Sequence, residues 1–217
     1  HIYANNLEKS MEFPLIALVV SGGHTELIYM KDEYEFEKLG ETLDDAVGES
    51  YDKVARVIGV GYPGGPVLDK MAKEGTHEYN LPIPLNNDSY NFSFSGLKSA
   101  VINLAHNYEQ KGIKLNKENL AKSFQDVVVE TITKKTIKAL KDKNVKRLII
   151  AGGVAANSGI RDGLNKACKE NNIDCSYPEL KYCTDNAAMI GAAAYFAYKK
   201  GITADSSLNA TSSVNLI

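Results

Sequence analysis

Two pairs of glycines each follow an apolar run, and both could bring bare backbone to a ligand. One pair lies in residues 21–24 (Ser-Gly-Gly-His) and the other at 152–153. Glycine tolerates positive φ and carries no Cβ, so its amides can approach a phosphate closely. The second pair also precedes a helical pattern, and the first amides of a helix attract anions. Neither pair fits the dinucleotide fingerprint or the P-loop. Each pair is therefore either an ordinary tight turn or a nucleotide-binding turn.

Several carboxylates fall on or near the first helical pattern, after the glycine turn at 21–24. Asp45, Glu49 and Asp52 are spaced i, i+4 and i+7, which places them on one side of a helix. Such a face is either solvated, with its negative charge near the helix N-terminus, or it holds hydroxyls or a cation through Asp52 or a neighbouring carboxylate. Asp69, just after the Pro-Gly-Gly-Pro loop at 63–66, carries the same two alternatives.

A third set of polar residues stands at the starts of two further helical patterns. Asp185 opens a helix rich in small residues, where it is either an N-cap or a metal carboxylate. In "FSFSGLK", Ser95 could cap the start of a helix, or Lys98 could instead contact a phosphate or a substrate strand. The histidines at positions 1, 24, 77 and 106 form no His-Glu-x-x-His pair, so no metalloprotease site is indicated.

The elements that must position these groups are a β-meander, a mostly helical middle and a β-α-β-α run. Apolar runs and turns predict strands at 13–20, 26–30 and 34–40. Helical spacing predicts helices at about 46–58, 67–73, 96–107 and 118–141, the first capped by Thr42, Asp44 or Asp45. The last third predicts strands at 147–151 and 174–176, with helices at 157–170 and 185–200.

This layout predicts an α/β fold of the ribonuclease-H-like kind, as in the actin, Hsp70 and sugar-kinase group (ASKHA), in which two such turns clasp phosphates. We expect residues 1–60 to form the first part of that lobe and 61–143 a mostly helical insertion. Residues 144–204 are expected to complete the lobe, and 205–217 to form a loose tail.

Length and composition restrict the class of protein further. The 217 residues are 44% hydrophobic and 24% charged, enough for a sizeable core and typical of a globular protein. No apolar stretch is long enough to span a bilayer and no signal peptide opens the chain. A net charge of -2 argues against wholesale wrapping of nucleic acid. The cysteines at 168, 175 and 183 favour reduced thiols and a cytoplasmic protein.

Six motifs in order resemble one family, the TsaD tRNA N6-adenosine threonylcarbamoyltransferases, formerly called glycoprotein endopeptidases. They are "ALVVSGGHTEL", "GETLDDAVGESYDKVARVIG", "YPGGPVLDKMA", "FSFSGLK", "AGGVAAN" and "CTDNAAMIGAAAY". The resemblance implies an acyltransferase-type enzyme that modifies tRNA. It would move the threonylcarbamoyl group from threonylcarbamoyl-adenylate to N6 of the adenosine beside the anticodon, in tRNAs that read codons beginning with A.

The resemblance also implies site residues and partners. Substrate contacts are expected at Val19, Val20, Ser21, Gly22, Gly23, Asp52, Gly65, Asp69 and Asn157. A divalent metal, iron or zinc, is expected on His1 and Asp185. No catalytic nucleophile or base is assigned. The expected partners are tRNA, a TsaB-like paralogue and a TsaE-like ATPase.

The family pattern begins with an H-x-x-x-H metal motif, of which His1 resembles the second member. We therefore expect a piece that lacks the other lobe of a two-lobed fold, is inactive alone, and self-associates or dimerises through an exposed apolar face. The alternative function is a non-catalytic nucleotide-binding or scaffold subunit of the same tRNA-modifying complex. A metalloprotease and half of a sugar or acetate kinase are alternatives from other enzyme classes.

Overall fold

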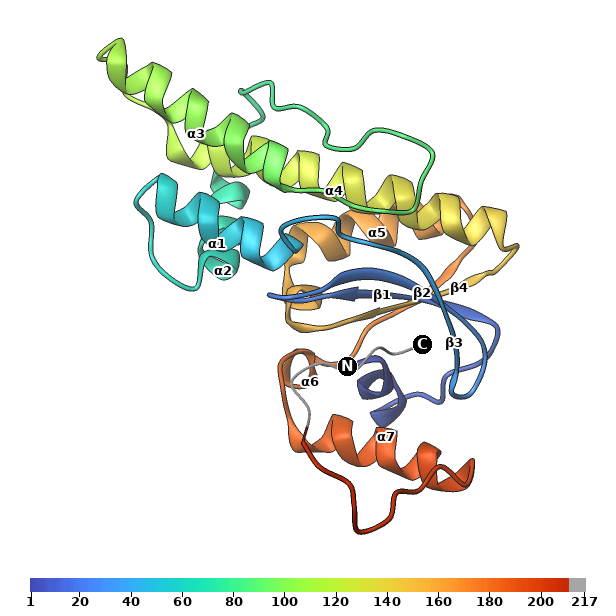
Figure 1. Cartoon of the computed structure of the whole chain (residues 1–217). Helices are drawn as coiled ribbons and strands as arrows, with labels where there is room; N and C mark the ends of the chain where they lie inside the picture. Colours follow the sequence, from blue (N-terminus) through green and yellow to red (C-terminus); the bar gives the residue numbers. More distant parts are fainter. Residues whose placement is uncertain (211–217) are drawn as a thin grey trace.

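A computed structural model describes residues 1–210; residues 211–217 lie outside the described part, and with them most of the expected tail. Within the described residues the strands form one five-stranded sheet in the order β3-β2-β1-β4-β5 (Figure 1). β1 pairs antiparallel with β2 and parallel with β4, so the sheet is mixed. The strands are β1 (Leu15–Val20), β2 (Thr25–Asp32), β3 (Glu35–Glu41), β4 (Arg147–Ala151) and β5 (Asp174–Ser176).

Helices cover both faces of this sheet (Figure 1). One face carries α1 (Val47–Val57), α2 (Gly64–Glu74), α3 (Ser95–Gln110), α4 (Lys117–Asp142) and α5 (Ser158–Glu170). Near the other face lie the 3-10 helix η1 (Ile2–Leu7), α6 (Leu180–Cys183) and α7 (Ala187–Lys199). A short 3-10 helix, η2 (Gly153–Ala156), joins β4 to α5.

The continuous apolar run of β1 follows from this double cover. Its residues alternate between two cores, since Ile16 and Leu18 pack under the larger helical layer. Ala17 and Val19 pack on the η1 and α7 side. Because successive side chains of a strand point to opposite faces, a strand covered on both sides is apolar at every position.

The predicted strands and helices are present with small shifts at their ends. Strands 147–151 and 174–176 match β4 and β5, and the helix expected at 118–141 is α4. The helix expected from Asp185 begins at Ala187 because Asn186 caps it, accepting a hydrogen bond from the Met189 amide at 2.9 Å. Among residues 1–210, every helix is too short or too polar to cross a membrane. The division of the chain at 60, 143 and 204 stays a prediction.

The expected caps of the first helix were wrong. The N-cap of α1 is Ala46, and the Val47 amide donates to the Thr25 hydroxyl of β2 at 2.9 Å. Asp44 instead accepts from the amides of Phe94 and Ser95 at 2.8 and 3.2 Å, so it caps α3. A side chain from a remote segment thus supplies each cap, which local sequence spacing does not reveal.

Asp45 ties the start of α1 to α3. Its carboxylate accepts from Lys53 at 2.7 Å and from Lys98 at 3.0 Å, so Lys98 is engaged within the fold. Burial alone would raise the pKa of Asp45, but the hydrogen bonds from Lys53 and Lys98 outweigh it and leave the pKa lowered. The ionised form is therefore favoured in the folded state.

Asp45→Asn should lower the free energy of unfolding by about 1–2 kcal/mol at neutral pH. Because a lowered folded-state pKa stabilises above the unfolded pKa of about 4, the difference should shrink as pH falls and vanish near pH 2. Urea denaturation at both pH values measures this, with exposed Asp162→Asn as control. An equal loss at the two pH values would contradict the electrostatic explanation.

Candidate functional site

The two glycine turns lie side by side at one edge of the sheet. β1 and β4 are parallel neighbours, with Val19 opposite Ala151, so the turns leave the same edge. Gly152 has φ +96°, and a Cβ there would overlap the carbonyl oxygen of Val20. Only glycine suits this backbone conformation. The contact of the two turns therefore requires glycine at 152.

The first turn is held by Ser21. Its hydroxyl oxygen accepts from the amides of Gly23 and His24 at 3.3 and 3.0 Å, and its own amide donates to the His24 carbonyl at 2.8 Å. The turn is thus a tight hairpin connection between β1 and β2. It also leaves open space, since a Cβ on Gly22 or Gly23 would meet no atom of the described residues within 4 Å.

A cavity of about 270 Å³ opens beside the two turns. Its lining comes from the first turn, α1, the start of α2, and the segment that follows β4. Four of the expected substrate contacts line it, and they come from four separate motifs: Gly22, Asp52, Gly65 and Asn157. The other lining residues are Gly48, Tyr51, Pro63, Pro66, Gly153, Val154 and Thr184.

A family model, described as TsaD: tRNA N6-adenosine threonylcarbamoyltransferase, matches residues 1–192. The chain belongs to the TsaD family. A curated relative of that name from Staphylococcus carnosus is 59% identical to this chain, and the match covers all of this chain and 63% of the relative. In Staphylococcus saprophyticus the identity is 58%, over 96% of this chain and 61% of the relative. The chain thus spans less than two thirds of the length of these relatives.

Solved structures of other proteins share the fold. HypF from T. kodakarensis has a TM-score of 0.69 at 15% identity, covering 93% of this chain and 37% of HypF. An activator of the 2-hydroxyisocaproyl-CoA dehydratase from Clostridium difficile has a TM-score of 0.52 at 14% identity, covering 96% of this chain and 70% of the activator. The expected ASKHA-type α/β fold is confirmed.

Not every residue expected from the TsaD resemblance reaches the cavity. Val19 and Val20 are buried strand residues whose side chains fill the cores, and Ser21 and Gly23 shape the turn. Asp69 does not line the cavity either, since its carboxylate faces the start of α5.

Asp52 and Asp69 both accept hydrogen bonds at the start of a helix. Asp52 Oδ1 accepts from the Gly64 amide at 2.7 Å and so fixes the loop that leads into α2. Asp69 accepts from the amides of Ser158 and Gly159 at 3.0 and 3.2 Å, and from the Ser158 hydroxyl. The amides of Ser158 and Gly159, which the second glycine pair suggested as an anion site, are therefore already occupied by Asp69.

Gln125 of α4 is a buried polar residue that sequence analysis missed. Its amide nitrogen donates to Asp69 Oδ1 at 3.1 Å. Its amide oxygen accepts from the Tyr51 hydroxyl and from Asn157 Nδ2, each at 3.2 Å. Burial, and then the charge of Asp69, raise the pKa of Tyr51, so its hydroxyl stays protonated. The signal in the sequence was a single glutamine, directly after Phe124, beside the apolar stripe of this helix.

Arg161 of α5 was also missed. Its guanidinium donates to the carbonyl of Ala155 in η2 and to that of Pro178 at 3.2 Å. It also lies 3.4 Å from Cys183 Sγ and 4.1 Å from the centre of the Tyr177 ring. Arg161 thus joins the second glycine turn to the segment that leads to Thr184 and Asp185.

His1 and Asp185, the two expected metal ligands, face each other. His1 Nε2 lies 3.3 Å from Asp185 Oδ1, while His1 Nδ1 is buried without a hydrogen-bond partner in the described structure. Asn186 caps α7, so Asp185 does not serve as the N-cap. An imidazole and a carboxylate suit iron or zinc, and the pair fits two positions of a coordination shell. Residues 1–210 contain no cluster of three such side chains.

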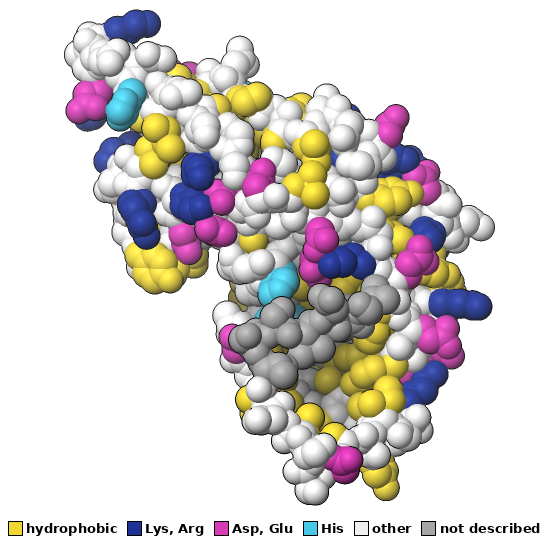
Figure 2. Space-filling model, in the orientation of Figure 1, with side chains coloured by type: hydrophobic (Ala, Val, Ile, Leu, Met, Phe, Trp, Pro, Cys, Tyr) yellow, Lys and Arg dark blue, Asp and Glu magenta, His cyan; other side chains and the backbone are white. Residues whose placement is uncertain are grey.

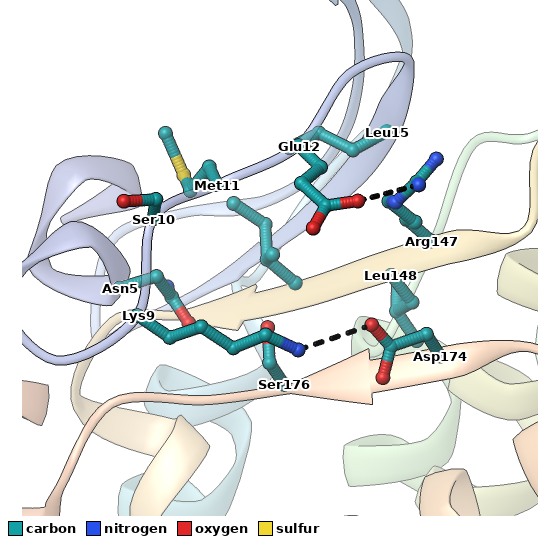
Figure 3. A pocket seen from close by; sticks show the side chains of 11 residues that line it. Asn5, Lys9, Ser10, Met11, Glu12, Leu15, Arg147, Leu148, Asp174 and Ser176 are labelled. Carbon is teal, nitrogen blue, oxygen red and sulfur yellow. Dashed lines mark hydrogen bonds and ion pairs between the residues drawn. The ribbon is translucent and has the colours of Figure 1, made fainter.

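A second hollow lies at the opposite end of β4 and is not part of this site (Figure 3). It measures about 30 Å³. Its charges are paired with one another, Arg147 with Glu12 at 2.6 Å and Lys9 with Asp174 at 3.4 Å. Small size and internal pairing leave little to recognise a ligand.

Gly152→Ala should lower the free energy of unfolding by about 2–4 kcal/mol, because the methyl group meets the Val20 carbonyl and φ is unfavourable for alanine. Urea denaturation measures the change. Gly191→Ala is the matched control: there a Cβ meets no atom of the described residues within 4 Å, and alanine favours the helix by up to about 1 kcal/mol. Similar behaviour of the two variants would refute the close approach of the turns.

Proposed function

We propose that this chain provides the adenylate pocket of a tRNA N6-adenosine threonylcarbamoyltransferase. The reaction transfers the threonylcarbamoyl group from threonylcarbamoyl-adenylate to N6 of the adenosine beside the anticodon, in tRNAs that read codons beginning with A. The observation that carries the proposal is the meeting of Gly22, Asp52, Gly65 and Asn157 at one cavity. Membership of the TsaD family supports the choice of reaction.

The pocket suits a substrate that arrives activated. Threonylcarbamoyl-adenylate is a mixed anhydride with AMP as leaving group, so the protein must mainly bind and orient it. The glycine backbone at 22 and 153 offers neutral donors for phosphate oxygens, and Asn157 offers an amide. Asp52, as an anion, suits hydroxyl donors such as those of a ribose. No residue is assigned as nucleophile or general base.

His1 and Asp185 would hold the divalent metal, iron or zinc, on the side of the cavity that Thr184 lines. When bound, such an ion polarises a carbonyl as a Lewis acid. Arg161 supports this arrangement because it fixes the segment before Asp185 against the second glycine turn.

The proposed partners are tRNA, a TsaB-like paralogue and a TsaE-like ATPase, and the proposed location is the cytoplasm. The three cysteines, all within the described residues, are free, which is typical of reducing compartments. Self-association stays a prediction. Hydrophobic side chains are exposed on α7, and others gather around it (Figure 2); the exposed ones include Ile190, Tyr195 and Tyr198.

A chimaera tests the proposed reaction directly. In the Staphylococcus carnosus relative, this chain would replace the segment that it matches over its full length. With partner proteins, threonylcarbamoyl-adenylate and tRNA, the chimaera should modify the tRNA, detected by mass spectrometry of its nucleosides. The 217-residue chain assayed beside it should bind AMP in calorimetry but not modify tRNA.

Three outcomes would contradict these expectations. AMP binding by the chain and an inactive chimaera, with the parent relative active, would favour the non-catalytic nucleotide-binding subunit. Turnover by the 217-residue chain alone would refute its expected inactivity. A chain that binds no AMP would remove the support for the adenylate pocket itself.

Asp185→Ala should weaken metal binding by about tenfold or more. Loss of a residue that only hydrogen-bonds to a metal ligand already costs about tenfold in metal affinity. Calorimetry with Zn²⁺ on the 217-residue chain measures the affinity. Asp162→Ala, on the exposed face of α5, is the control and should bind as the wild type does. Unchanged Zn²⁺ affinity in Asp185→Ala would exclude Asp185 as a ligand.

A further inference from the structure

We propose that Gln125 is a positioning residue of the adenylate pocket, acting through Asn157 and Asp69; this rests on the proposed function. Gln125 lies on α4 and is 6% exposed. Its three hydrogen-bond partners belong to α1, α2 and the start of α5. One side chain therefore contacts α1, α2 and the start of α5, and its hydrogen bonds fix how these helices lie relative to one another.

The direction of these hydrogen bonds is determined by the partners. The ionised carboxylate of Asp69 can only accept, so the Gln125 amide nitrogen must point at it. The Gln125 oxygen is then left to accept from Tyr51, which stays protonated, and from Asn157 Nδ2. A glutamine carries one donor and one acceptor group, and this site uses both.

Asn157 is oriented as a result. Its Nδ2 donates to Gln125, and its Oδ1 accepts from the Ile160 amide at 2.9 Å. Each end of the Asn157 amide keeps one further hydrogen-bonding position, one donor and one acceptor. Because Asn157 lines the cavity, Gln125 and the Ile160 amide together decide which donor and acceptor a ligand meets there.

Packing around Gln125 agrees with this role. A Cβ on Gly159 would overlap Gln125 Nε2, so glycine at this position leaves room for the Gln125 amide where it now lies. A buried amide without partners is costly, whereas one with all its hydrogen bonds made holds a single arrangement. The helix α4 thus contributes to ligand recognition without itself lining the cavity.

Gln125→Glu separates positioning from simple packing, because the two side chains have nearly the same shape. A protonated glutamic acid keeps the pattern of one acceptor and one donor, whereas the ionised form has no donor and faces the charge of Asp69. AMP binding to the 217-residue chain, measured by calorimetry, should weaken about tenfold or more at pH 8. It should recover toward the wild-type value as the pH is lowered to 5.5.

The double variant Asp69→Asn with Gln125→Glu restores a donor opposite the carboxylate, so it should regain most of the AMP affinity and lose the added pH dependence. Gln110→Glu, the same substitution at the exposed end of α3, should bind as the wild type does. Gln125→Leu should weaken binding equally at all pH values. Thermal melting of each variant reports whether it is folded.

The outcomes distinguish this inference from the function on which it rests. If the wild type binds AMP and both Gln125→Glu and Gln125→Leu bind equally well at every pH, Gln125 has no positioning role and the proposed function stands. If Gln125→Glu weakens AMP binding without pH dependence and the double variant brings no recovery, the positioning role of Gln125 is likewise refuted. If the folded wild type binds no AMP, the adenylate pocket fails, and the inference with it.

Discussion

The parallel pairing of β1 with β4 is the constraint on which the site depends. It places two strand ends at one edge of the sheet, and Gly152 lets the second turn press against the carbonyl of Val20. The rest of the cavity lining comes from α1, the start of α2, η2, Asn157 and Thr184. Both faces of β1 must be covered for this pairing to be buried, which the two cores achieve.

Carboxylates hold the helices around this edge in place. Asp44, Asp52 and Asp69 each accept from amides at the start of a helix that lies elsewhere in the sequence. A helix N-terminus carries unpaired donors and partial positive charge, so an acceptor brought from another segment both satisfies it and orients it. Two of the acids that the sequence marks as candidate ligands, Asp52 and Asp69, therefore act as structural supports, and Asp52 also lines the cavity.

The sequence predicts the strands, the long helices and the two glycine turns, because each depends on local periodicity and on glycine's backbone freedom. Motif resemblance adds the residues that meet at the cavity. The caps of α1 and α3 escaped prediction, since Thr25 and Asp44 act across long sequence separations. Gln125 and Arg161 escaped for the same reason: each takes its meaning from partners on other elements, which spacing along a single helix does not encode.

The charge of the cavity lining has a consequence for selectivity. Of the described residues that line it, Asp52 alone is charged, and it is an anion. Phosphate oxygens at this wall would meet neutral backbone and amide donors without a compensating lysine or arginine. A ligand with a single phosphate group and one negative charge is tolerated in such surroundings, whereas each further phosphate adds repulsion that nothing on this wall offsets. The side chains that line the proposed adenylate pocket would therefore disfavour nucleoside di- and triphosphates by charge.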